Sequence, residues 1–162
     1  MKEQRFSLAK IRSKAFCLGA TITMAALAAL SIPSFTDNGS AEAHSRGGRW
    51  IEVDRYGQSL TAWEGGRRVR TFVVSTGKRS TPTYGGTYAI QSKYRSTSMS
   101  GRGYYVPDVP YAMFYSGGYA VHGAYWHNRF GTPVSHGCVN MRVSQARWLY
   151  NWAPVGTRVV VR

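Results

Sequence analysis

The chain contains one cysteine whose sequence surroundings favour nucleophilic chemistry. Cys138 lies in Ser135-His136-Gly137-Cys138-Val139-Asn140, sixteen residues after His122-Gly123. The only other cysteine, Cys17, lies in an N-terminal segment that we expect to be removed, so Cys138 would have no partner for an intrachain disulfide. A lone cysteine with histidines nearby in sequence is typical of a thiol nucleophile that works with a general base.

The residues after this cysteine predict a polar face beside the thiol. If residues 138–143 are extended, Cys138, Asn140 and Arg142 share one face, because alternate side chains of a strand point the same way. Arg142 would then lower the pKa of the thiol or bind a substrate carboxylate. Gly137 leaves room beside the thiol, its N–H and that of Cys138 could face an oxyanion, and Ser135 could fix the turn.

Three histidines lie within the sixteen residues before the cysteine, and each has a different expected role. His122 ends the apolar stretch 119–121, and a histidine at the end of a rigid strand is well placed as a general base. His136 lies two residues before the thiol, on the same side of an extended chain. His127 follows Tyr125 and Trp126 in an aromatic loop, where we expect a structural role or a substrate contact.

Two other kinds of site compete with a cysteine nucleophile. His122, His127, His136 and Cys138 are enough ligands for zinc, but the spacings H-x4-H and H-x-C match no common zinc pattern, so we expect no metal. A serine hydrolase is disfavoured because Ser135 lacks the Gly-x-Ser-x-Gly setting. No nucleotide or cofactor motif is visible, so we expect no cofactor. A non-catalytic binding module stays open as an alternative.

The N-terminal segment has the pattern of a secretory signal peptide. Five basic residues occur within the first 14, an uncharged run covers residues 15–32, and Ala41-Glu42-Ala43 follows. We predict a signal peptide over residues 1–43, with an uncleaved membrane anchor as the alternative. Either case places the remainder outside the cytoplasm, as a short lead-in over 44–48 and a single domain over 49–162.

The remaining chain is strongly basic. From His44 onward it has 16 arginines and lysines against four acidic residues, a net charge of +12. We expect such a protein to be attracted to polyanions, such as anionic cell-wall polymers, anionic lipid or nucleic acid, with solubility and no specific ligand as the alternative. The charges are spread along the chain and no nucleic-acid-binding motif is present, which argues against a nucleic-acid partner. A membrane contact is expected only through an uncleaved N-terminal segment.

Short apolar runs predict a mostly β fold, either a sandwich or a barrel. Gly65-Gly66 indicates a hairpin turn, and one short helix is expected from an N-cap at Ser144 to a stop at Pro154. Residues 95–110 read as an irregular loop, in the length range of a lid or binding loop. Strands are expected near residues 50–53, 60–63, 69–74, 87–90, 111–115, 119–121 and 157–161.

The motifs around His122 and Cys138 resemble the signature of the YkuD-type L,D-transpeptidases. The similarity extends over about residues 49–162, and Thr81-Pro82-Thr83 followed by Gly86-Thr87-Tyr88 is similar to a further family element. The resemblance implies a single β-sandwich-like domain with one short helix after the nucleophile motif. It also implies that Cys138 is the nucleophile and His122 the base, that the Gly123 carbonyl orients His122, and that His136 supports the thiol or the oxyanion site.

The resemblance further implies a peptidoglycan substrate. The family's cysteine attacks a stem tetrapeptide, releases D-Ala and passes the acyl group to an amine, which gives a 3→3 cross-link in the cell wall. Some members use water as the acceptor and act as L,D-carboxypeptidases. Asn140 and Arg142 would have supporting roles, while loop 95–110 and the Tyr125-Trp126 loop are candidates to close over the donor peptide.

Overall fold

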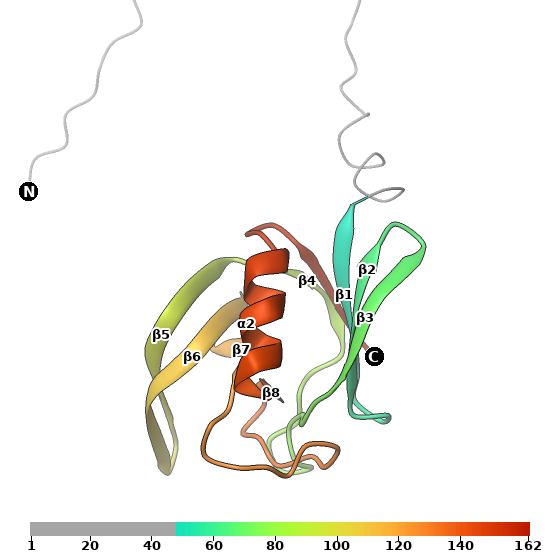
Figure 1. Ribbon diagram of the computed structural model, residues 1–162. Helices are drawn as coiled ribbons and strands as arrows, with labels where there is room; N and C mark the ends of the chain where they lie inside the picture. Colours follow the sequence, from blue (N-terminus) through green and yellow to red (C-terminus); the bar gives the residue numbers. More distant parts are fainter. Residues whose placement is uncertain (1–47) are drawn as a thin grey trace, which may run out of the picture. The chain divides into compact units, whose positions relative to one another are not determined.

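A computed structural model describes residues 48–162 of the chain, which form nine strands and one helix (Figure 1). The predicted signal peptide and the first residues of the predicted lead-in lie outside these described residues. The strands are β1 (Arg49–Asp54), β2 (Ser59–Glu64), β3 (Arg67–Val73), β4 (Gly86–Ala89), β5 (Ser92–Gly101), β6 (Tyr104–Ser116), β7 (Tyr119–Gly123), β8 (Val139–Met141) and β9 (Arg158–Val161), and the helix is α2 (Val143–Trp152).

The strands form two sheets, which confirms the predicted sandwich-like, mostly β fold. One sheet has the order β3-β2-β1-β9-β4, and the other has the order β5-β6-β7-β8 (Figure 1). Most neighbouring strands are antiparallel, and the predicted Gly65-Gly66 turn joins β2 to β3, with Glu64 paired to Arg67. Two pairs are parallel, β1 with β9 and β7 with β8. The second parallel pair positions the candidate site.

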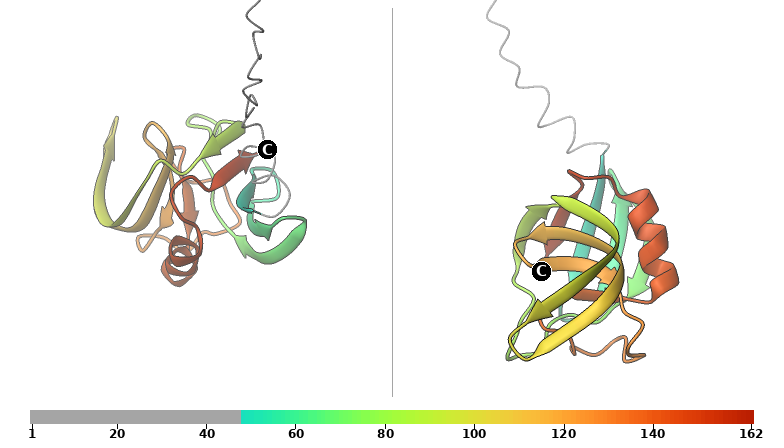
Figure 2. Two further views of the ribbon diagram at one scale, coloured as in Figure 1. Left: turned by 90° about the horizontal axis from the view of Figure 1, so that it is seen from above. Right: turned by 90° about the vertical axis from the view of Figure 1, so that its left-hand side faces the viewer.

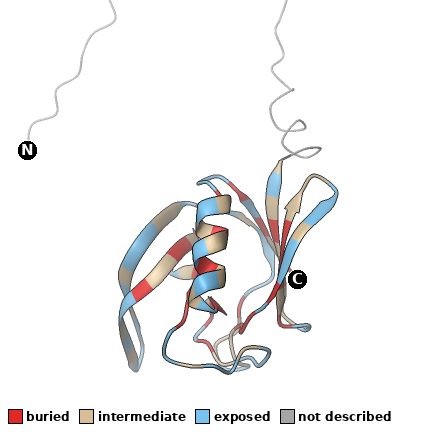
Figure 3. Cartoon of the chain, viewed as in Figure 1, coloured by how far each residue is buried: buried red, intermediate tan, exposed pale blue. Residues whose placement is uncertain are grey.

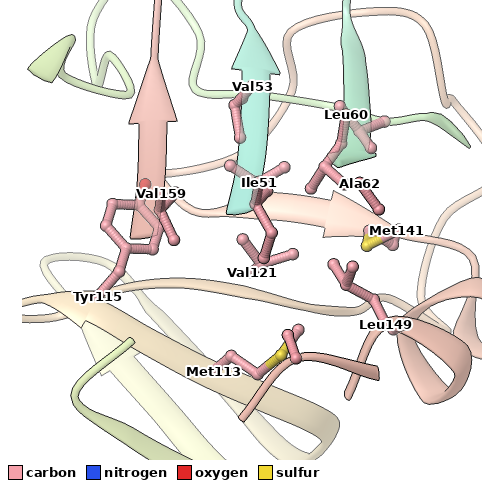
Figure 4. Packing of buried hydrophobic residues seen from close by; sticks show 14 of the residues in the cluster. Ile51, Val53, Leu60, Ala62, Met113, Tyr115, Val121, Met141, Leu149 and Val159 are labelled. Atoms are coloured by element: carbon pink, nitrogen blue, oxygen red, sulfur yellow. The ribbon is translucent and has the colours of Figure 1, made fainter. Parts of the chain in front are cut away.

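Apolar side chains from both sheets and from α2 meet in one core. Buried residues alternate with more exposed ones along β1, which has the period of two that a half-buried strand requires (Figure 3). Each fully buried aliphatic side chain contributes about 1.5–3 kcal/mol to folding. The residues labelled in Figure 4 are Ile51, Val53, Leu60, Ala62, Met113, Tyr115, Val121, Met141, Leu149 and Val159.

The prediction of an irregular loop over residues 95–110 is wrong, because these residues belong to the long curved hairpin of β5 and β6 (Figure 2). The prolines that suggested a loop, Pro107 and Pro110, lie in the half of β6 that pairs only with β5. Pairing of β6 with β7 begins at Met113. Proline has no backbone N–H to donate, and it is tolerated there because no strand pairs with the other edge of this half of β6.

Helix α2 packs against β6 and β7, and it begins earlier than the sequence suggested. Arg142, not Ser144, occupies the N-cap position, and no side chain caps the first turn. At the other end, Lys93 of β5 donates from Nζ to the carbonyls of Tyr150 and Ala153, both at 2.6 Å. This lysine satisfies helix carbonyls that would otherwise lack donors.

Candidate active site

A cavity of about 310 Å³ lies where the β5–β6 hairpin, the end of β7 and the segment around the cysteine meet. The β5–β6 hairpin contributes mainly apolar side chains to the lining, and residues 122–140 contribute most of the polar ones. The lining residues are Met99, Tyr104, Val106, Val109, His122, Trp126, His127, Arg129, Val134, Ser135, His136, Cys138 and Asn140.

Parallel pairing of β7 and β8 brings the two halves of the motif together. Val121 pairs with Val139, and His122 pairs with Asn140. Cys138 comes directly before the paired residues of β8, beside the middle of β7. His122, Cys138 and Asn140 therefore lie on the wall of the same cavity, although up to eighteen residues separate them in sequence. The extended segment is shorter than expected, because only residues 139–141 form a strand.

Ser135 and Gly137 shape the turn that precedes the nucleophile. The Ser135 Oγ accepts the Gly137 N–H at 3.0 Å and donates to the Cys138 carbonyl at 2.5 Å. Gly137 has a φ of +121°, a conformation that favours glycine. The expectation that the Gly137 N–H could face an oxyanion is wrong for this arrangement, because that donor is already bound to Ser135.

Two threonines from the loop after β3 hold the same turn in place. The buried Thr83 hydroxyl accepts the Gly77 N–H at 2.8 Å and donates to the Gly137 carbonyl at 2.7 Å. Thr81 donates to the Ser135 carbonyl at 3.1 Å. In the sequence, Thr81 and Thr83 stand out only through a family resemblance, and no local pattern predicts this contact, because 54 residues separate each threonine from its partner.

The Cys138 thiol is held close to the start of β7. Its Sγ lies 3.7 Å from the Gly118 carbonyl, which accepts the S–H. Burial raises the pKa of the Cys138 thiol, and a backbone hydrogen bond from Ala120 partly opposes that change. Arg142 does not lower this pKa as expected: its guanidinium lies over the Phe130 ring, 4.8 Å from the centroid, and it does not line the cavity.

His122 is buried and neutral near pH 7. Only 2% of its surface is exposed, and its Nδ1 lies 3.0 Å from the Gly123 carbonyl. Because a carbonyl can only accept, Nδ1 carries the proton and Nε2 keeps a lone pair. Burial lowers the pKa of His122 to about 4, although the hydrogen bond to Gly123 acts in the opposite direction. The ring is therefore able to accept a proton at neutral pH.

His136 lies at the rim of the cavity between a lysine and a tyrosine. Its Nε2 accepts a hydrogen bond from the Lys78 ammonium at 3.3 Å. The Tyr104 ring stacks on the imidazole with the centroids 4.4 Å apart. Partial burial, and then the positive charge of Lys78, lower the pKa of His136. This side chain is thus a neutral ring held in a fixed orientation.

His127 and Asn140 form a pair on the cavity wall. The side-chain amide of Asn140 lies 2.9 Å from Nε2 of His127, and the backbone N–H of Arg129 donates to Nδ1 at 3.2 Å. Asn140 is also held by its backbone, which exchanges two hydrogen bonds with Ser75. Both side chains are therefore fixed, and the structural role or substrate contact expected for His127 stays a prediction.

The aromatic loop contributes one of its two predicted residues to the cavity. Trp126 lines it, with its ring centroid 5.7 Å from that of His122. Tyr125 does not line it, and its hydroxyl donates instead to the Pro107 carbonyl of β6 at 2.7 Å. Tyr125 therefore ties this loop to the β5–β6 hairpin, which also contributes lining residues.

The described residues show neither a metal site nor a membrane-spanning helix. Among residues 48–162, no three side chains of the histidine, cysteine, aspartate and glutamate types cluster as metal ligands would. The one helix in this part of the chain is too short to cross a bilayer.

Comparison with known proteins matches the chain to one family. The family model for the YkuD L,D-transpeptidase catalytic domain matches residues 48–161. The chain is 36% identical over 115 residues to L,D-transpeptidase 2 of Mycobacterium tuberculosis, covering 63% of this chain and 28% of that protein. It is 34% identical over 90 residues to the probable L,D-transpeptidase YbiS of Escherichia coli, covering 51% of this chain and 28% of that protein.

Solved structures agree with the sequence comparison. An L,D-transpeptidase from Mycobacterium smegmatis superposes with a TM-score of 0.66 at 28% identity, covering 70% of this chain and 58% of that one. An Enterococcus faecium L,D-transpeptidase mutant superposes with a TM-score of 0.67 at 27% identity, covering 70% and 49%. The chain spans less than a third of the length of the two relatives compared by sequence.

Proposed function

Because the chain belongs to the YkuD family of L,D-transpeptidase catalytic domains, we propose that it is an extracytoplasmic enzyme that forms 3→3 cross-links between peptidoglycan stem peptides. One observation carries this proposal: the parallel pairing of β7 and β8 places a buried, neutral His122 and the Cys138 thiol on the wall of one cavity. A thiol and an adjacent base are the groups that acyl transfer through a thioester requires.

In the proposed first step, His122 Nε2 takes the Cys138 proton while the sulfur attacks the donor carbonyl. The carbon–nitrogen bond to the terminal D-Ala then breaks, the imidazolium returns the proton to the leaving amine, and a thioester remains on Cys138. In the second step, the amine of another stem attacks the thioester. His122 accepts the proton of that amine, and the thiol is restored.

The oxyanion of each tetrahedral intermediate needs a donor near the thiol. Since the Gly137 N–H is bound to Ser135, we assign this role to the Cys138 N–H. Ser135 and Gly137 then act by shaping the turn. We assign His136 to support of the thiol, Asn140 and Trp126 to donor contacts, and Gly123 to the orientation of His122. Tyr125 would act only by holding its loop.

The thiol in the free protein is protonated at neutral pH, because burial raises its pKa and burial lowers that of His122. A preformed thiolate–imidazolium pair is therefore not the resting state. The proton transfer accompanies attack on the donor, and water is excluded from the site as the donor fills the cavity.

The test is to incubate the full chain with a disaccharide-tetrapeptide and to identify the products by mass spectrometry. We expect a cross-linked dimer with loss of one D-Ala, and no product from Cys138→Ala. Tripeptide without dimer would identify water as the acceptor and an L,D-carboxypeptidase. No turnover by the wild type would contradict the proposal and leave a wall-binding module.

The proposed location rests on the sequence and on the family. A secretory segment at residues 1–43 would deliver the domain to the wall, and its positive charge would hold it near anionic wall polymers. Sedimentation with purified sacculi at low and high salt tests the charge attraction. Equally poor sedimentation in both would refute it, because attraction between exposed charges weakens as salt screens them.

A further inference from the structure

Arg129 is the only side chain with a permanent charge among those that line the cavity. It belongs to the loop between β7 and β8, where no sequence motif predicts a role for it. Its guanidinium can bind a carboxylate through two parallel hydrogen bonds, a geometry that a lysine cannot reproduce.

The rest of the cavity wall leaves this charge without a partner. Burial lowers the pKa of His122 and of His127, so both rings are neutral near pH 7, and no acidic residue lines the cavity. Within residues 48–162, the three ion pairs use Glu64 twice and Glu52 once, and none includes Arg129. The exposed guanidinium therefore has no counter-charge among the lining residues, and it is free to bind an anion that enters the cavity.

The backbone of Arg129 is fixed although its side chain is exposed. Its N–H donates to Nδ1 of His127 at 3.2 Å, and its carbonyl accepts the Ser75 hydroxyl at 2.8 Å. In the described part of the chain, its guanidinium takes part in none of the side-chain hydrogen bonds, ion pairs or cation–π contacts. The residue thus combines a positioned backbone with an unengaged, charged end.

We propose that Arg129 is a specificity-determining residue that binds a carboxylate of the donor stem peptide. This inference rests on the proposed function, since the stem peptide is the ligand that the cavity would hold. His127 contributes as a positioning residue, because it holds the Arg129 backbone and the Asn140 amide on the same wall. The proposal predicts that the enzyme prefers donors whose carboxylate at one position is free rather than amidated.

The test compares one parent tetrapeptide with donors in which each free carboxylate is converted, one at a time, to an amide. The full-length wild type is measured beside Arg129→Gln, which removes the charge at similar size. Arg147→Gln is the matched control, because Arg147 is exposed on α2 and does not line the cavity. Thermal unfolding of each variant checks that the fold is retained.

For the wild type we expect kcat/KM to fall about 10- to 100-fold on one amidated donor, the range for a hydrogen-bonded charged pair. Arg129→Gln should lose the same factor on the parent donor and show no further loss on that amidated donor. Arg147→Gln should behave as the wild type does. Equal preferences in Arg129→Gln and the wild type would overturn the proposal.

A binding measurement separates this proposal from the proposed function. In the Cys138→Ala background, calorimetric Kd values for the same donors need no turnover. If the wild type proves inactive on every donor, the transpeptidase assignment fails, while the Kd series still decides the role of Arg129. If Cys138→Ala and the double variant that also carries Arg129→Gln have the same Kd for every donor, the proposed role of Arg129 is refuted.

Discussion

Replacement of His122 by asparagine should change how the stability of this protein depends on pH. In the unfolded chain the imidazole titrates near its ordinary value of 6.5, whereas burial lowers the pKa in the folded protein to about 4. Between these values the unfolded state binds one more proton than the folded state does. The free energy of unfolding therefore falls as the pH falls from 6.5 to about 4, and the contribution is fully present above pH 6.5.

The size of the effect follows from that pH interval. Each pH unit within it corresponds to about 1.4 kcal/mol, so the free energy of unfolding should fall by about 3 kcal/mol through His122 alone. Other titrating groups, including His127 and His136, add a pH dependence that the wild type shares with His122→Asn. The difference between the two proteins isolates the contribution of the buried ring.

Urea unfolding of both full-length proteins at pH 4, 5, 6, 7 and 8 measures this difference. His122→Asn is expected to be less stable at pH 7, because it loses the fitted ring and its hydrogen bond to Gly123. The two curves should converge by about 3 kcal/mol towards pH 4. Parallel curves over this range would show that the ring is not a buried neutral imidazole, and the proposed state of the general base would fail with it.

Two further predictions concern the thiol and the turn before it. Alkylation of Cys138 should be slower than that of free cysteine at pH 7, and its rate should increase above pH 9, because burial raises the thiol pKa. Mass spectrometry of the peptide that contains Cys138 measures this rate. A rate profile with its midpoint below pH 8 would contradict the prediction. Gly137→Ala should lower the free energy of unfolding by about 2–5 kcal/mol, because φ is +121° and the new Cβ would lie 2.5 Å from Tyr119 Cε1. Gly66→Ala meets no atom within 4 Å and is the control; equal losses in the two variants would show that neither strain nor crowding matters at residue 137.

Most of the fold could be predicted because apolar patterns and turn residues are encoded in short stretches of the sequence. Alternation of apolar residues identified β1 and β2, and Gly65-Gly66 identified the turn to β3. The hairpin of β5 and β6 was missed because proline disrupts a strand only where its missing N–H is needed, and because Gly101 and Gly103 mark only the end of β5 and the turn to β6. Whether Pro107 and Pro110 face a neighbouring strand depends on where the pairing of β6 with β7 ends.

The start of α2 and the position of Arg142 were also missed for a reason outside the local sequence. An extended segment through residue 143 would have placed Arg142 beside the thiol. The strand instead stops at Met141 because α2 begins at Val143, and the guanidinium turns to the Phe130 ring. Competition between a strand and a helix at this junction is settled by packing of α2 against β6 and β7.

The sequence by itself determined which chemical groups the candidate site contains, since the thiol, the histidines and the turn residues lie in short motifs whose residue types and spacing are readable. Only the tertiary structure decided the states of those groups. The protonation of His122 and Cys138 depends on burial between two sheets, and the use of the Gly137 N–H depends on the Ser135 turn. The support of that turn by Thr83 and the place of Arg129 among the lining residues depend on segments that meet only when the chain folds.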